Sequence, residues 1–139
     1  MKLSKKSIKE ESKKKKRISV HSAKAKGRNA QKHIAKKISE LLNLPCGKDC
    51  LIASREMGQS GVDIRLVGEA FDRFRYDIEV KNQEKWSVLS WIDQAKSNQK
   101  EGRDWLLFMT KNHRPYFVTM DADHFFELME KINGKGNRH

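Results

Sequence analysis

The chain has 139 residues, with 30 Lys or Arg against 18 Asp or Glu, so its formal net charge is +12 and its sequence pI is about 9.8. This length suits a single domain behind a short extension and is too small for two hydrophobic cores. The positive charge favours a polyanionic partner such as a nucleic acid. No stretch approaches the ~20 apolar residues of a membrane span, so we expect a soluble cytoplasmic protein with no membrane partner.

The start of the chain holds most of this charge. Residues 1–26 contain 11 Lys or Arg and two Glu, a net charge of +9. The most basic stretch is Lys13, Lys14, Lys15, Lys16 and Arg17. Because few apolar residues accompany it, we predict a disordered arm over residues 1–26 that binds phosphates. A solubilising tail or a nuclear-import-like signal fits the same composition. The folded domain is predicted over residues 27–133 and a flexible tail over 134–139.

Hydrophobic periodicity predicts the first helix from about Asn29 to Pro45, because apolar residues recur at helical spacing until the proline stops the run. Three short apolar runs then predict three strands. They cover residues 50–54, 62–67 and 76–81. Turn-forming residues separate the first two strands, and the charged stretch 68–75 separates the second from the third.

The second half of the chain predicts a helix, two strands and a final helix. Ser87 can cap the first of these helices, and strands follow at residues 105–110 and 116–119. Asp121 can cap the last helix. Its apolar residues are Phe125, Phe126, Leu128, Met129 and Ile132. The order of helix, three strands, helix, two strands and helix predicts an α/β fold.

The aromatic, histidine and cysteine residues give no clear site. The three tryptophans are spaced with aliphatic neighbours, which favours the core over base stacking. His113 and His124 have no partner at ligand spacing, and we expect both on the surface. Cys46 and Cys50 form a lone C-x3-C, a weak zinc signal, and are predicted to be reduced thiols without a functional role.

Two acidic features lie on neighbouring predicted strands. Asp63 stands near the start of the second strand, and Glu79-Val80-Lys81 lies in the third. Successive side chains of a strand point to opposite faces, so Glu79 and Lys81 share a face. If the two strands pair as a hairpin, Asp63 reaches the same place, and two carboxylates lie beside a lysine. On a lysine-rich chain, an E-x-K triplet also fits a solvated strand face with a weak ion pair.

Two carboxylates at one place suit a divalent cation. About 4 Å apart, they repel by roughly 4 kcal/mol at the effective dielectric of a protein surface. Hard oxygen ligands prefer Mg²⁺ or Mn²⁺. Such an ion could polarise a phosphodiester and orient a water, while Lys81 positions that water or stabilises the charged transition state. The implied reaction is phosphodiester hydrolysis with Mg²⁺ as cofactor, and we expect Mn²⁺ to substitute for it.

In the order and placement of these elements, the chain resembles the PD-(D/E)xK nuclease superfamily, and within it the archaeal and phage Holliday junction resolvases. The resemblance rests on Lys26-Gly27, Ser60-Gly61-Val62-Asp63-Ile64, Ile78-Glu79-Val80-Lys81 and Gln94-Ala95. It implies a restriction-endonuclease-like αβββαβ core, with a mixed central sheet flanked by helices and here a C-terminal helix. It also implies that Asp63 and Glu79 bind the metal at a site that includes Val80, that Lys81 serves the attacking water, and that Ser60 lies near the DNA backbone.

One position departs from this pattern. The first helix of that family carries a glutamate a few residues after the glycine, whereas the matching residue here is Gln31. An amide can still contact a metal-bound water, but it brings no charge. Glu40 would face away from it on the helix. Glu56, in the loop before Asp63, is a better substitute, although a solvated loop charge explains it as well. The number of metal ions is left open.

Weaker signals surround the acidic cluster. The resemblance gives Gln94 a place pointing into the site, although on position alone it is equally a helix-surface amide. Arg28, Arg55 and Lys111 are candidates for phosphate contacts, because backbone binding needs cations and no particular base sequence. Each of them also fits an ordinary surface charge.

Together these features predict a Mg²⁺-dependent endodeoxyribonuclease that cuts branched DNA. A Holliday junction resolvase is the favoured interpretation, and we expect no small-molecule cofactor. We expect a homodimer, because a four-way junction needs two strands cut and one small domain offers one site. The pairing surface could be the final helix or the strand at residues 116–118. Three alternatives stay open: a flap, nick or restriction-type nuclease on the same fold, a noncatalytic nucleic-acid-binding protein, and a basic ribosome-associated protein.

Overall fold

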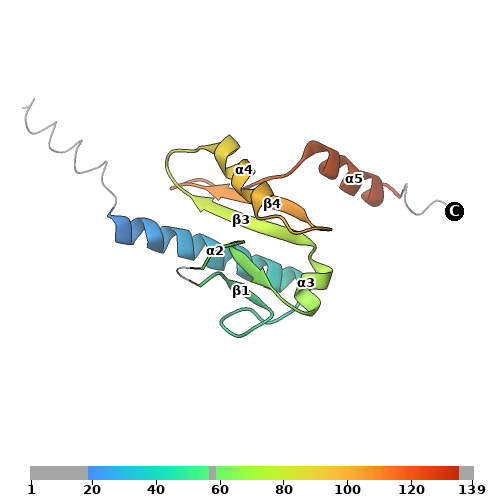
Figure 1. Ribbon diagram of the computed structural model, residues 1–139, viewed down its shortest axis with the longest axis horizontal. Helices are drawn as coiled ribbons and strands as arrows, with labels where there is room; N and C mark the ends of the chain where they lie inside the picture. Colours follow the sequence, from blue (N-terminus) through green and yellow to red (C-terminus); the bar gives the residue numbers. More distant parts are fainter. Residues whose placement is uncertain (1–18, 57–58, 135–139) are drawn as a thin grey trace, which may run out of the picture.

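The computed structural model describes residues 19–56 and 59–134, which form helices on both faces of a strand layer (Figure 1). The elements in chain order are α2 (Val20–Leu42), β1 (Ile52–Ser54), β2 (Ile64–Leu66), α3 (Glu69–Arg73), β3 (Tyr76–Asn82), α4 (Val88–Ser97), β4 (Asp104–Thr110), β5 (Phe117–Thr119) and α5 (Ala122–Ile132). The predicted run from Lys13 to Arg17 lies outside the described residues, as do residues 135–139 of the predicted tail.

The strands form a mixed sheet next to a hairpin. Strand β3 pairs in parallel with β4, and β4 pairs antiparallel with β5. A parallel pair needs a crossover, which α4 provides. Strands β1 and β2 form an antiparallel hairpin, and β2 reaches β3 through a hydrogen bond of 3.0 Å from Asp63 N to Ile78 O. The predicted α/β class with a mixed sheet and flanking helices is confirmed.

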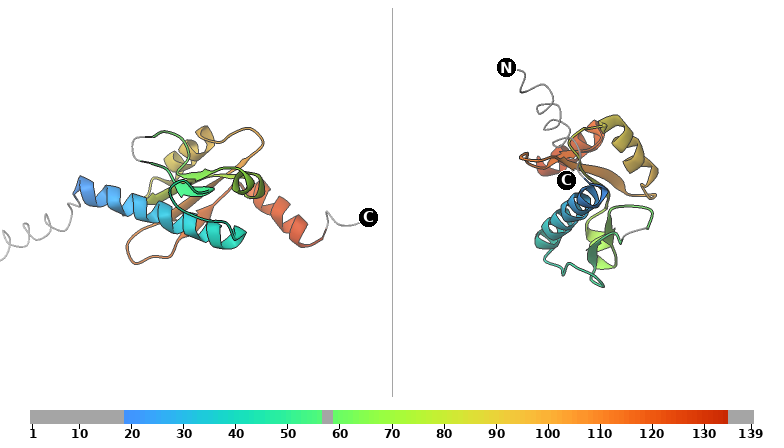
Figure 2. Two further views of the ribbon diagram at one scale, coloured as in Figure 1. Left: turned by 90° about the horizontal axis from the view of Figure 1, so that it is seen from below. Right: turned by 90° about the vertical axis from the view of Figure 1, so that its left-hand side faces the viewer.

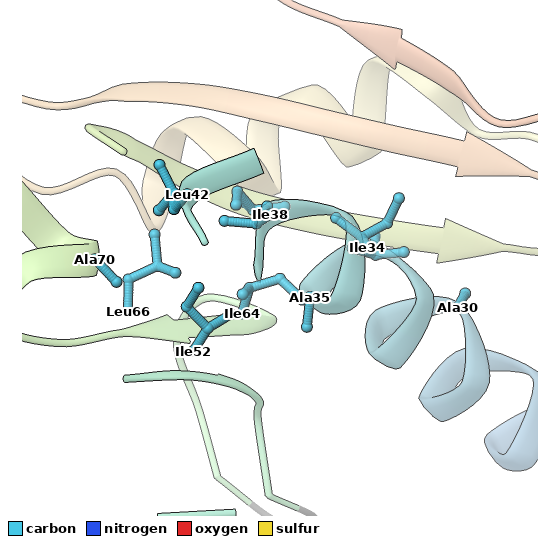
Figure 3. Packing of buried hydrophobic residues seen from close by; sticks show 11 residues of the cluster. Ala30, Ile34, Ala35, Ile38, Leu42, Ile52, Ile64, Leu66 and Ala70 are labelled. Carbon is cyan, nitrogen blue, oxygen red and sulfur yellow. The ribbon is translucent and has the colours of Figure 1, made fainter. Parts of the chain in front are cut away.

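Helix α2 covers one face of the strands, and its apolar side builds the larger core (Figure 3). Its buried residues are Ala30, Ile34, Ala35, Ile38 and Leu42, which pack against Ile52, Ile64 and Leu66. The helix begins at Val20, where Ser19 Oγ accepts a hydrogen bond of 3.1 Å from Ser22 N. Residues 20–26, which the sequence analysis placed in the arm, are therefore helical. Their Ala and Lys residues favour a helix but carry no apolar period that would have indicated one.

Helix α4 covers the opposite face, so the two helices enclose β3 and β4 between them (Figure 2). Trp91 and Ala95 of α4 pack on Trp105, Leu107 and Met109 of β4. The predicted core position is confirmed for Trp91 and Trp105, which are buried, while Trp86 is half-buried. The alternation along β3 sends Ile78 and Val80 into the α2 core. The side chains of Glu79 and Lys81 therefore belong to the α4 face.

The charged stretch 68–75, which was predicted only to separate two strands, contains the five-residue helix α3. A buried ion pair fixes its end: Arg103 Nε lies 3.1 Å from Asp77 Oδ1, and both side chains are only 4% exposed. The guanidinium also donates to backbone carbonyls of Phe71, Phe74 and Tyr76. Because so short a helix cannot be stable by itself, α3 depends on this tertiary network.

The C-terminal helix α5 is attached mainly by polar contacts. His124, predicted to lie on the surface, is instead half-buried, with Nε2 2.7 Å from Tyr76 Oη. Asp121 accepts a hydrogen bond of 3.0 Å from Trp105 Nε1. The apolar side chains of Phe125, Phe126 and Ile132 remain exposed. His113 is exposed, as expected, and Cys46 and Cys50 are free thiols.

Candidate active site

The structure brings Asp63 and Glu79 together at the junction of β2 and β3. Asp63 is 3% exposed and Glu79 is 1% exposed. Asp63 Oδ2 accepts a hydrogen bond of 2.8 Å from Val80 N, which ties the carboxylate to the strand that carries Glu79. The two carboxyl groups lie close enough for Asp63 to raise the pKa of Glu79. Two acids sixteen residues apart in the sequence thus form one buried pair.

Burial dominates the electrostatics of Glu79. It raises the pKa of the Glu79 carboxyl to about 7, and the charge of Asp63 acts in the same direction. The hydrogen bond from Asn98 and the charge of Lys81 oppose these effects. Glu79 Oε2 is buried and has no hydrogen-bond partner among the described residues. Because a buried carboxylate oxygen is costly to leave unpaired, this site is short of positive charge.

Asp63 differs from Glu79 because a cation already neutralises it. Arg55 Nη2 lies 3.2 Å from Asp63 Oδ1, and Arg55 Nη1 donates a hydrogen bond of 2.7 Å to Gly61 O. The Arg55 backbone also donates to Asp63 O at 2.8 Å. Both carboxylate oxygens of Asp63 therefore have partners, one from Arg55 and one from Val80.

Asn98, which the sequence analysis did not select, contacts Glu79 directly. It follows the last residue of α4, and its Nδ2 donates a hydrogen bond of 2.7 Å to Glu79 Oε1. Gln94, the predicted residue on this helix, is exposed. A signal for Asn98 existed, because it continues at helical spacing the buried side formed by Trp91 and Ala95.

The other predicted catalytic residues lie on both sides of the strand layer. Lys81 is half-buried on β3, and its charge favours the ionised form of Glu79. Gln31 is half-buried on α2, the helix that packs against the face of β3 opposite to Glu79. Glu56 is exposed and lines a cleft beside the site.

A basic cleft of about 1430 Å³ adjoins the acidic pair. Its cationic lining residues are Arg28, Lys32, Lys36, Lys48, Arg55, Arg65, Lys100 and Arg103. Ser60, Gly61 and Val62 also line it, so the cleft reaches the turn that precedes Asp63. Among the predicted phosphate contacts, Arg28, Arg55 and Ser60 lie on the cleft, whereas Lys111 is half-buried after the end of β4.

The donor set suits a hydrated Mg²⁺ ion held by few protein ligands. Mg²⁺ usually keeps several waters and takes one or two carboxylates together with substrate phosphates. Glu79 Oε2 is a buried acceptor without a protein partner in the described part of the chain, and Asp63 is its acidic neighbour. Val80 contributes its backbone N–H to Asp63. Within residues 19–56 and 59–134, no group of three or more His, Cys, Asp or Glu side chains could hold a metal.

Comparisons with known proteins found no match among protein-family models, curated proteins or solved structures. Within the described residues, no helix combines the length and apolar character needed to cross a membrane.

Proposed function

We propose that this protein is a Mg²⁺-dependent endodeoxyribonuclease that hydrolyses phosphodiester bonds in branched DNA, with the Holliday junction as its preferred substrate. The observation that carries the proposal is the buried pair of Asp63 and Glu79 beside a basic cleft. The order of elements from α2 to β4 agrees with the αβββαβ core that the resemblance implies, with α3 inserted before the third strand. The restriction-endonuclease-like core is part of the same proposal.

The residues of the pair have complementary roles in this reaction. Asp63 and Glu79 would hold the ion, while water and phosphate oxygens complete its coordination shell. The bound ion would supply Lewis-acid polarisation of the phosphoryl oxygen and offset charge on the leaving oxygen. Lys81, on the same strand face as Glu79, would orient the attacking water and stabilise charge that develops on the phosphate. Asn98 fixes Glu79 Oε1 and leaves Oε2 for the ion.

The basic cleft would bind the DNA backbone. Arg28, Lys32 and Lys36 are spaced four residues apart on α2 and line the cleft together. This spacing sets them on one side of the helix over ~12 Å. Cations bind phosphates of any base sequence, so such a row suits an enzyme that recognises DNA shape. We refer to these three residues as the α2 basic row.

A homodimer would provide the two sites that paired incisions across a junction require. Two apolar surfaces are candidates for pairing. One is a groove of about 340 Å³ between α2 and β5, lined by Leu41, Phe117 and Val118 among others. The second is the exposed apolar side of α5, with Phe125 and Phe126.

A cleavage assay on the full chain tests this function. The protein is incubated with a synthetic four-way junction, a flap and a plain duplex, each with Mg²⁺ or EDTA. We expect paired, symmetric, Mg²⁺-dependent incisions on the junction. Asp63→Asn and Glu79→Gln should abolish cutting and leave junction binding intact. Asp72→Asn, which changes an exposed carboxylate on α3, should cut at the wild-type rate.

The same assay separates the alternatives. Cutting of the flap or duplex in preference to the junction would assign a different substrate to the same chemistry. Tight binding without metal-dependent cleavage of any substrate would instead support a noncatalytic nucleic-acid-binding protein. That second function is favoured by one observation: Asp63 already has Arg55 as its counter-ion.

A further inference from the structure

The ion pair between Arg55 and Asp63 occupies one of the two carboxylates assigned to the metal. Arg55 Nη2 lies 3.2 Å from Asp63 Oδ1, and the Asp63 side chain is 5% exposed against 27% for Arg55. The second oxygen of Asp63 already accepts a hydrogen bond from Val80 N. A divalent ion approaching Asp63 therefore meets a carboxylate with no unengaged oxygen among its described contacts.

Glu79 provides the contrast within the same pair. Its Oε2 is buried without a partner among the described residues, while Oε1 is bonded to Asn98. Among the described residues, Glu79 Oε2 thus has no cation beside it, whereas Asp63 Oδ1 is paired with the Arg55 guanidinium. A buried charge left without a counter-charge destabilises a fold, which explains why Asp63 keeps an internal partner when no ion is bound.

Arg55 is held beside Asp63 by two contacts, yet it lies at the border of the basic cleft. Its guanidinium makes a second hydrogen bond, of 2.7 Å to Gly61 O, which keeps it beside Asp63. The side chain is nevertheless partly exposed and lines the basic cleft. The guanidinium therefore borders open space on the side of the cleft.

We propose that Arg55 is the resident counter-cation of Asp63 and competes with the divalent ion for that carboxylate. This inference rests on the proposed metal-dependent function and adds a positioning role for Arg55, which is also a candidate contact of DNA phosphates. Arg55 offsets the charge of Asp63 in the metal-free protein and weakens metal binding until it is displaced. Removing the guanidinium should therefore strengthen metal binding, the opposite of the effect expected for a residue that supports the metal site.

The test measures Mn²⁺ binding to the full chain from the electron paramagnetic resonance signal of free Mn²⁺. Arg55→Gln should bind Mn²⁺ about tenfold more tightly than wild type, because a charge-assisted hydrogen bond no longer has to be broken. Arg75→Gln is the matched control, since Arg75 also donates to a glycine carbonyl, Gly102 O at 3.4 Å. It removes the same charge and should leave Mn²⁺ affinity unchanged.

The outcomes separate this inference from the proposed function. Wild-type or weaker Mn²⁺ affinity in Arg55→Gln would overturn the competition and leave the metal nuclease in place. Absence of Mn²⁺ binding in both wild type and Arg55→Gln would overturn the metal site and the inference with it.

A second measurement uses wild-type protein and so does not depend on the folding of a variant. Guanidinium signals of Arg55 are followed by NMR during a Mg²⁺ titration. They should shift in step with the carboxyl signals of Asp63 and Glu79 as the ion displaces the guanidinium. Carboxyl signals that respond while Arg55 stays constant would overturn the proposal.

Discussion

Asn98 donates a hydrogen bond of 2.7 Å from Nδ2 to Glu79 Oε1, and the same nitrogen lies 3.5 Å from Gly61 O. One amide thus joins the end of α4 to β3 and to the turn before Asp63. Among the described residues, Glu79 Oε2 has no hydrogen-bond partner. The orientation of the Glu79 carboxyl group therefore depends strongly on Asn98.

Asn98→Ala should slow Mg²⁺-dependent junction cleavage by about 10- to 100-fold, the usual cost of losing a partner that orients a metal ligand. It should also raise the pKa of Glu79 further, because the Asn98 hydrogen bond favours the ionised carboxyl. Single-turnover cleavage and an NMR pH titration of the carboxyl group measure the two effects.

Ser97→Ala is the control for Asn98→Ala, because it changes the neighbouring exposed residue and should affect neither quantity. Gln94→Ala tests whether Gln94, on the same helix, contributes to cleavage as the resemblance implies. Equal cleavage by Asn98→Ala and wild type would mean that Asn98 only ends the helix.

The raised pKa of Glu79 predicts a specific loss of stability with pH. The pKa is about 7 in the folded protein against an ordinary value of 4.5, so the native state binds this proton more tightly than the unfolded state does. Binding of this proton by Glu79 stabilises the fold fully below pH 4.5, and this stabilisation is lost as the pH rises through 7. It amounts to roughly 3 kcal/mol.

Urea unfolding in EDTA measures this contribution as the difference between wild type and Glu79→Gln. The variant should lack the loss and be the more stable protein at pH 8, and added Mg²⁺ should restore wild-type stability there by binding the ionised carboxyl. If the free energy of unfolding varies with pH in the same way in both proteins, burial does not raise the pKa of Glu79.

The proximity of Asp63 and Glu79 could be predicted because it depends on local features. Asp63 directly precedes β2, and Glu79 lies on β3, the next strand along the chain. The expected hairpin of these two strands is replaced by pairing of β2 with β1, and Asp63 reaches β3 through its backbone bond to Ile78 O. Strand alternation correctly set Glu79 and Lys81 on one face. Ser87 and Asp121 stand at the N-cap positions of α4 and α5, as predicted, but neither side chain makes a capping hydrogen bond. These features need no knowledge of how distant segments pack.

The partners of the acidic pair could not be predicted in the same way. Asn98 reaches Glu79 because the α4 crossover returns the chain beside β3. Arg55 reaches Asp63 because the pairing of β1 with β2 sets the two residues opposite each other. Helix α3 depends on Arg103, which is distant in sequence and bonds the Phe71 and Phe74 carbonyls. The contact partner is a tertiary outcome in each case; for Asn98, helical spacing indicated the buried side of α4 but not the contact with Glu79.

The α2 basic row predicts a change in the salt dependence of DNA binding. Lys32→Gln with Lys36→Gln should weaken junction binding and reduce the slope of log affinity against log salt by about 1.8, since each lost phosphate contact contributes about 0.9. Binding measured by fluorescence anisotropy over a salt series, with Asp63→Asn present to prevent cutting, gives this slope.

A charge-matched variant controls for the change in net charge. Lys37→Gln with Lys131→Gln removes the same two charges from exposed positions outside the basic cleft, one beside the apolar groove and one on α5. It should leave the slope nearly unchanged. Equal slopes for the two double variants would mean that DNA senses only the total charge and that the α2 basic row is not a binding track.

The buried pair of Asp77 and Arg103 predicts a large effect on stability. Asp77→Ala would leave the Arg103 guanidinium buried without its counter-charge, which costs about 3–5 kcal/mol in comparable cases. The loss should be seen as a lower urea midpoint with an unchanged m-value. Asp123→Ala removes an exposed carboxylate from α5 and should shift the midpoint little. If both variants unfold at the same urea concentration, the Arg103 network does not hold α3 and the start of β3 in place.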